Sequence, residues 1–165
     1  MRTSKAFRIL SLVLFLLALS STTFAARPEI SSDKQTFDFL SGRYLLDGNV
    51  CVKWPDRTIT AEHAQVSLLT MEVWAQGNIT LRQDDIFFRG DDLHVTGNSH
   101  TADINGNTRF ERGDLTIQSN VASFNWDTKL AEFSENVVRI LAGEKKEFSR
   151  LVYNVITKEF AEEKE

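Results

Sequence analysis

Three histidines are the side chains best suited to acid–base or metal chemistry in this sequence. His63, His94 and His100 lack the four-residue spacing with which a helix presents two zinc ligands. Two acidic pairs, Asp84-Asp85 and Asp91-Asp92, flank a short apolar segment, but a calcium site needs several oxygen ligands at loop spacing. We therefore expect ordinary strand histidines and solvated turns, with no metal site and no bound cofactor.

Hydrolytic and nucleophilic chemistry has no stronger basis. The chain has 23 acidic residues, and no spacing singles out the carboxylate pair that a glycosidase uses. Its one cysteine, Cys51, falls on the polar side of a predicted strand, which favours a small strand residue over a reactive thiol, although an unpaired cysteine can join two exported chains. Lys145-Lys146 is interpreted as a solvated hairpin tip, with contact to lipid phosphates as the alternative. No catalytic residue is predicted, and the protein is expected not to be an enzyme.

Length, composition and charge restrict the class of protein. A chain of 165 residues allows one domain and hardly two. Hydrophobic residues make up 42% and charged residues 25% of it, which predicts that most of the chain folds. The net charge of −4 argues against nucleic-acid binding, since proteins that bind by counterion release are usually basic.

The first 25 residues are predicted to be a cleaved signal peptide. A basic start precedes an apolar run over residues 9–19, and the segment ends in Thr23-Phe24-Ala25, a small-x-small cleavage pattern. The run is shorter than the about 20 residues of a spanning helix, so an uncleaved anchor is the less favoured alternative. Cleavage after Ala25 would leave 16 cations against 23 acids in one domain over residues 26–165.

The body of the chain repeats every 29 residues. Asn49, Asn78, Asn107 and Asn136 are spaced by this step, and a glycine precedes each of the first three. Other columns keep the same phase: Leu46, Ala75, Ile104 and Phe133; Val50, Ile79, Thr108 and Val137; Asp56, Asp85, Asp114 and Gly143. The last of these columns lies in turn-forming sequence. A repeat of this length indicates stacked supersecondary units.

Each repeat is predicted to contain two strands. Val73, Ala75, Ile79 and Leu81 alternate with polar residues, which is typical of a strand with one buried face. In the second strand of each unit the apolar pattern changes parity, which predicts a bulge or corner in its middle. Half units at residues 30–37 and 148–158 bring the total to about nine antiparallel strands, in a sheet open at both edges.

These columns resemble the OstA-like (LptA) family of periplasmic lipopolysaccharide-transport proteins. The resemblance covers roughly residues 30–158 and departs from the pattern at Thr108 and Glu135. It rests on these motifs: Gly48-Asn49-Val50, Gly77-Asn78-Ile79, Ile59-Thr60-Ala61-Glu62 with Ala64 and Val66, and Phe88-Arg89-Gly90-Asp91 with Leu93 and Val95.

The resemblance implies an all-β fold, a β-jellyroll open along one side, whose apolar interior takes the acyl chains of lipid A. It implies a periplasmic bridge between an inner-membrane lipopolysaccharide-transport complex and the outer-membrane translocon, with protomers joined end to end. The lining that it implies is Leu46, Val50, Val52, Ile59, Val66, Val73, Ile79, Leu81, Phe88, Leu93, Val95, Ile104, Phe110, Ile117, Phe124, Phe133 and Val137.

Three hypotheses on function follow. The first is a non-enzymatic lipopolysaccharide carrier, and the second is a membrane-tethered partner of the same fold. The third is a secreted β-sandwich hydrolase or carbohydrate-binding module, which predicts a cleft with paired acids or stacked aromatic rings. Trp54, Trp74 and Trp126 occupy different positions of the repeat, which speaks against the third. Inward apolar residues also fill the core of any β-sandwich, so periodicity alone does not separate a packed interior from a lipid-binding one.

Overall fold

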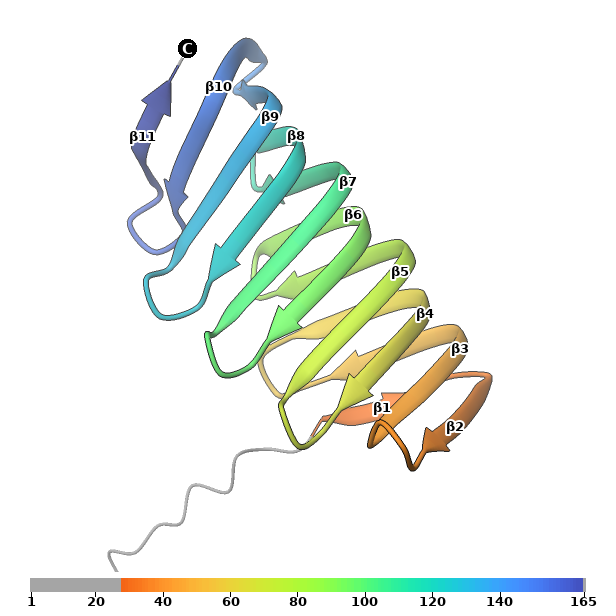
Figure 1. Ribbon diagram of the computed structural model, residues 1–165. Helices are drawn as coiled ribbons and strands as arrows, with labels where there is room; N and C mark the ends of the chain where they lie inside the picture. Colours follow the sequence, from red (N-terminus) through yellow and green to blue (C-terminus); the bar gives the residue numbers. More distant parts are fainter. Residues whose placement is uncertain (1–27, 165) are drawn as a thin grey trace, which may run out of the picture.

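In the computed structural model, residues 28–164 form one open antiparallel sheet of eleven strands (Figure 1). The all-β fold predicted from the repeats is therefore confirmed. The predicted signal segment, residues 1–25, lies outside the described residues. The strands are β1 (Glu29–Ser31), β2 (Lys34–Asp38), β3 (Arg43–Lys53), β4 (Thr58–Ser67), β5 (Glu72–Gln83), β6 (Ile86–Thr96), β7 (Thr101–Arg112), β8 (Leu115–Asn125), β9 (Leu130–Leu141), β10 (Glu144–Asn154) and β11 (Glu159–Lys164).

Strands β3 to β11 pair in chain order, and β1 and β2 both pair with β3. The predicted two-strand repeats correspond to β3–β4, β5–β6, β7–β8 and β9–β10. The sheet has eleven strands rather than about nine for two reasons. The N-terminal half unit is divided between β1, which pairs with residues 51–53, and β2, which pairs with residues 43–47. In addition, β11 follows the last repeat and pairs with residues 150–154.

Each of the strands from β3 to β10 bends in its middle. The ladder register shifts at the bend, for example between Thr60 and His63 in β4, so the predicted corner in the second strand of each unit is confirmed. The first strand of each unit has a corner too, which was not predicted. In β3 it falls at Gly48 and Asn49, whose φ angles of 74° and 48° are costly for most residues.

An acidic side chain from the segment that precedes each strand supports three of these corners. In β3, Asn49 Nδ2 donates a hydrogen bond of 2.9 Å to the carboxylate of Asp33. Glycine suits position 48, because the φ angle there is positive and a Cβ would lie 2.5 Å from Asp33 Oδ2 and 3.1 Å from Asp33 Cβ. The equivalent bonds join Asn78 to Glu62 and Asn107 to Asp91. The fourth corner has Glu135 and Asn136, which keep positive φ angles of 63° and 58° without glycine.

The corners divide the sheet into two walls (Figure 1). The front wall contains β2, β11 and residues 43–47, 63–67, 72–76, 92–96, 101–105, 121–125, 130–134 and 150–154. The back wall contains β1 and residues 50–53, 58–61, 79–83, 86–90, 108–112, 115–119, 137–141 and 144–148. The corners join the walls along one side, and the turns of both walls lie along the other.

The inner faces of the walls form the core. Phe88 and Phe110 of the back wall contact Phe133 of the front wall, with ring centroids 6.3 Å and 5.5 Å apart. Thr108, which stands in an otherwise apolar column, also faces inward, and its hydroxyl donates a hydrogen bond of 2.7 Å to the carbonyl of Ser119. Its polar group is thereby satisfied inside the core.

Candidate functional site

The interior between the walls is the candidate site. All seventeen residues predicted to line it are inward-facing members of the core, and none exposes more than 6% of its surface. The structure therefore brings the predicted lining together in one continuous apolar surface. Contact between these residues and acyl chains stays a prediction, because the same residues pack against one another.

The chemistry of the interior changes along the sheet. Its N-terminal part is aliphatic, with Leu46, Val52 and Ile59 among the buried residues. Its C-terminal part is aromatic, and there Phe110 contacts Tyr153 of the opposite wall with ring centroids 5.6 Å apart. Since close-packed side chains fill the space between the sheet faces, a lipid can enter only where the walls move apart.

Side chains hold the walls together along the side opposite the corners, which we call the seam. It consists of Arg57, Gln83 and Arg112 from the back wall and Trp126 and Val155 from turns of the front wall. Trp126 Nε1 donates a hydrogen bond of 2.8 Å to Gln83 Oε1, and the Arg57 guanidinium lies 4.4 Å from the Trp126 ring centroid. Arg112 donates to the carbonyl oxygen of Val155. These contacts can separate without breaking any strand pairing.

Two carboxylates belong to the same region. Asp85 accepts a hydrogen bond of 2.9 Å from Arg112, which lowers the pKa of Asp85 below its ordinary value. Asp56 accepts from Arg57, and that bond likewise lowers the pKa of Asp56. Asp85 thus forms an ion pair at the seam, and Asp91 accepts a hydrogen bond at a corner.

A cavity of about 630 Å³ opens in the seam toward the N-terminal end. Trp54 and Trp126 line it from opposite walls, together with Met71 and Val95. Two of the three tryptophans therefore meet in one place, although they occupy different positions of the repeat. Because Val95 also belongs to the core, this cavity borders the apolar interior.

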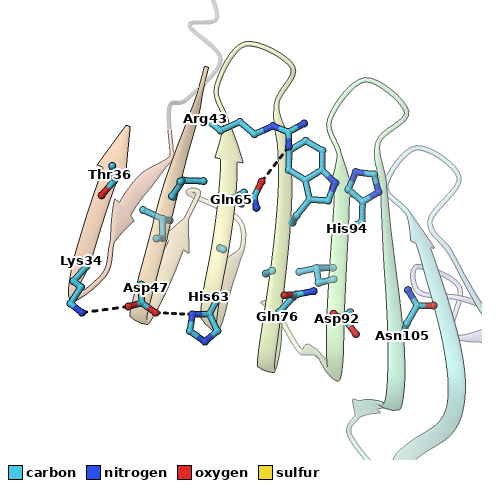
Figure 2. Close-up of a pocket in the computed structure, with 16 residues that line it drawn as sticks. Lys34, Thr36, Arg43, Asp47, His63, Gln65, Gln76, Asp92, His94 and Asn105 are labelled. Atoms are coloured by element: carbon cyan, nitrogen blue, oxygen red, sulfur yellow. Dashed lines mark hydrogen bonds and ion pairs between the residues drawn. The ribbon is translucent and has the colours of Figure 1, made fainter. Parts of the chain in front are cut away.

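A second groove, of about 760 Å³, lies on the outer face of the front wall (Figure 2). Trp74 lies in it between Arg43 on β3 and His94 on β6, whose groups are 4.0 Å and 5.2 Å from its ring. Both neighbours cover the indole, so little of it is left for a sugar to stack on. Gln65 accepts a hydrogen bond of 3.2 Å from Arg43. This arrangement does not favour a carbohydrate-binding module.

The remaining candidate residues are dispersed. His63 pairs with Asp47 at 2.7 Å and His100 with Asp127 at 2.8 Å, at separate places on the sheet. Within residues 28–164, no group of three or more His, Cys, Asp or Glu side chains is arranged to hold a metal ion. Cys51 is a free, partly exposed thiol. In the described part of the chain, residues 28–164, no helix is long and apolar enough to cross a membrane.

Comparison with known proteins identifies relatives of the fold. Residues 31–160 match the family model described as OstA-like protein. Among solved structures, the chain is similar to LptH of Pseudomonas aeruginosa, the LptA homologous periplasmic component of the conserved lipopolysaccharide transport device. The identity is 10%, the match covers 82% of this chain and 80% of that chain, and the TM-score is 0.42. No curated protein sequence matches the chain. The family match confirms the resemblance expected from the repeat columns.

Proposed function

Because the chain belongs to the OstA-like family, we propose that it is a periplasmic lipopolysaccharide carrier that shields lipid A acyl chains between its two walls. The observation that carries the proposal is an apolar inner face that extends from Leu46 on β3 to Tyr153 on β10, beside a seam held by side chains. Each CH₂ group left in water costs about 0.8 kcal/mol, so a lipid with several acyl chains needs such a cover to cross an aqueous compartment.

The seam cavity supports a route into the interior. It joins solvent to Val95, and its neighbouring contacts, from Trp126 to Gln83 and Arg57, involve side chains alone. Opening there would leave the corners and all strand pairs intact. We expect acyl chains to enter through this part of the seam and to displace packed side chains from one another.

The sheet edges support end-to-end assembly and the proposed partners. At one end β1 and β2 form the edge, and at the other end β11 and residues 144–148 of β10 form it. Backbone groups along such edges are free to pair with another strand. We expect a second copy to pair there, and the terminal copies to pair with an inner-membrane complex and an outer-membrane translocon.

Site-specific photo-crosslinking in cells tests the lipid path. A photo-crosslinking amino acid at Ile79 or Phe88, both on the inner face of the back wall, should trap lipopolysaccharide. Arg82 and Arg89 lie on the outer face of the same strands and serve as matched controls, which should trap none. Equal labelling of inner and outer positions would reject the interior path.

Removal of residues 159–165 tests the edge pairing. This change deletes β11 but keeps Leu151 and Tyr153, which belong to the core, so the sheet should stay folded by circular dichroism. Concentration-dependent assembly in sedimentation velocity should disappear. Assembly that persists unchanged in the shortened chain would show that β11 is not the contact.

A further inference from the structure

The most exposed large apolar side chains of residues 28–164 lie on two turns of the front wall. Phe39 and Leu40 belong to the turn that joins β2 to β3, and their exposed fractions are 88% and 101%. Leu69 belongs to the turn that joins β4 to β5, and its exposed fraction is 92%. Water disfavours such surface, and apolar side chains gathered in one exposed place mark a contact with a protein or a membrane.

The strand register places the two turns beside each other. Tyr44 of β3 pairs with Val66 of β4, and each lies one residue from the last pair of its own hairpin, so the two turns are level. Neighbouring strands are about 4.8 Å apart, which puts the centres of the turns about 10 Å apart. Both turns lie at the N-terminal end of the sheet, drawn orange to yellow in Figure 1.

Both turns satisfy polar groups with side chains of their own hairpins. The Asp38 carboxylate accepts a hydrogen bond of 3.0 Å from the backbone N–H of Leu40 and one of 2.6 Å from the hydroxyl of Ser41. In the second turn the backbone N–H of Thr70 donates a hydrogen bond of 3.2 Å to Ser67 Oγ. A donor that is already paired loses less when it leaves water. These bonds therefore lower the cost of moving the turns into an apolar environment.

The other front-wall turns differ from these two. The third turn, residues 97–100, is Gly-Asn-Ser-His. Trp126 and Val155, which begin the next two turns, are buried, and Ile156 beside Val155 is exposed. The two apolar turns also adjoin the seam cavity, because Met71, the last residue of the second turn, lines that cavity. The exposed apolar side chains thus gather at the end of the sheet where the cavity lies.

The size and chemistry of the two turns favour a lipid bilayer over a protein as the partner. The turns hold eight residues, 39–42 and 68–71, and none of the eight is charged. Each partner in a stable protein interface contributes about 20 residues or more, on a surface that must match its partner in shape. The hydrocarbon of a bilayer adapts its shape to an inserted side chain, so two narrow apolar turns suffice for a weak, reversible contact.

We propose that the turns at residues 39–42 and 68–71 insert Phe39, Leu40 and Leu69 into the surface of a lipid bilayer and thereby bring the seam cavity to that surface. The inference goes beyond the proposed function, because a carrier can receive its lipid from a protein alone and need not touch a bilayer. Insertion requires no lipid A, since the apolar side chains contact the acyl chains of any bilayer.

Flotation of the full mature chain with phosphatidylcholine vesicles tests the proposal. The wild type should float with these neutral vesicles equally at about 0.1 M and 1 M salt, because the contact is apolar and salt does not screen it. Leu40→Ser and Leu69→Ser should each lower the partition coefficient about tenfold, as expected for one large apolar side chain. Ile156→Ser is the matched control, since it changes an exposed side chain of the last front-wall turn, and it should float like the wild type.

Four outcomes would overturn bilayer docking. They are a wild type that stays unbound, binding that high salt removes, binding that appears only when the vesicles contain lipid A, and equal loss of binding in Leu69→Ser and Ile156→Ser. Substitutions at Leu40 and Leu69 that change self-association and leave flotation intact would assign the turns to a protein contact instead. Each of these results leaves the carrier function standing, because crosslinking at the inner face tests that function separately.

Discussion

The two ends of the interior are built from the same repeat but differ in chemistry. At the N-terminal end the buried side chains are aliphatic, as with Leu46 and Val52, and the seam contains a cavity. At the C-terminal end the core is aromatic around Phe133, and Arg139 crosses between the walls. The repeat therefore specifies a common backbone, while the residue in each column decides how the side chains pack at each end.

Alanine substitution of one column residue at each end of the interior should produce the largest difference in the free energy of unfolding. Phe133 and Leu46 occupy equivalent positions and are both buried. Phe133→Ala should lower the free energy of unfolding by about 4 kcal/mol, because it empties the centre of the aromatic cluster. Leu46→Ala should cost about 2 kcal/mol, since the aliphatic end can relax around a smaller cavity. Urea unfolding measures both, and equal losses would remove the packing difference between the ends.

A glycine at a corner and a glycine at a turn should differ in how much an alanine substitution destabilises the protein. Gly77 has a φ of +78°, and a Cβ there would lie 2.9 Å from the Glu62 Cβ, so Gly77→Ala should destabilise by about 2 to 3 kcal/mol. Gly113→Ala is the control, since its φ is +58° with nothing within 4 Å, and it should cost about 1 kcal/mol.

A substitution at the fourth corner, in β9, should stabilise the protein instead of destabilising it. Glu135 has a φ of 63° where the other corners have glycine, so Glu135→Gly should stabilise by about 1 kcal/mol. Both effects are measured by urea unfolding. A destabilised Glu135→Gly variant would show that contacts of Glu135 outweigh its backbone strain.

The ion pairs along the seam should give the smallest effect. The hydrogen bond from Arg112 lowers the pKa of Asp85, so the stability it contributes is present above the ordinary value of 3.8 and is lost as pH falls toward the folded-state pKa. Asp85→Asn should cost less than about 1 kcal/mol at neutral pH, because the carboxylate is half exposed and solvent screens it. It should also make the loss of stability below about pH 4 shallower.

Asp56→Asn should change the loss of stability at acid pH less than Asp85→Asn does. Arg57 is the chain neighbour of Asp56, so their pair can also form in the unfolded chain. Urea unfolding between about pH 7 and pH 3 compares the two variants. A larger effect at Asp56 would mean that the N-terminal part of the seam is the more tightly held.

The faces of the strands could be predicted because burial follows local alternation. Each predicted lining residue from Leu46 to Val137 stands in a column that is apolar in at least three repeats, and a parity change between Ala61 and Ala64 marks the corner in β4. The corner in β3 was missed, because its two extra residues leave Leu46 and Val50 in the same parity. Its signal is the Gly48-Asn49 pair, which tolerates the left-handed backbone that a sharp bend needs.

Features that depend on how the sheet folds over were not predictable from local pattern. Trp54 and Trp126 meet at the seam because two walls approach each other, and no sequence spacing encodes that distance. Arg139 is absent from the predicted lining for a different reason: the lining that the resemblance implies contains apolar residues alone. Following the column of Phe110 one repeat further would have placed Arg139 on the inner face.

The separation of the two walls tests the central claim most directly. Gln65 and Arg82 are exposed on the outer faces of the front and back walls, so spin labels at Gln65→Cys and Arg82→Cys, in a Cys51→Ser background, report the distance across the interior. Pulsed electron paramagnetic resonance should show this distance lengthen by about 4 Å when lipid A binds, the thickness of one layer of carbon atoms in contact. An unchanged distance in a sample that demonstrably holds lipid A would place the acyl chains outside the walls and contradict the account.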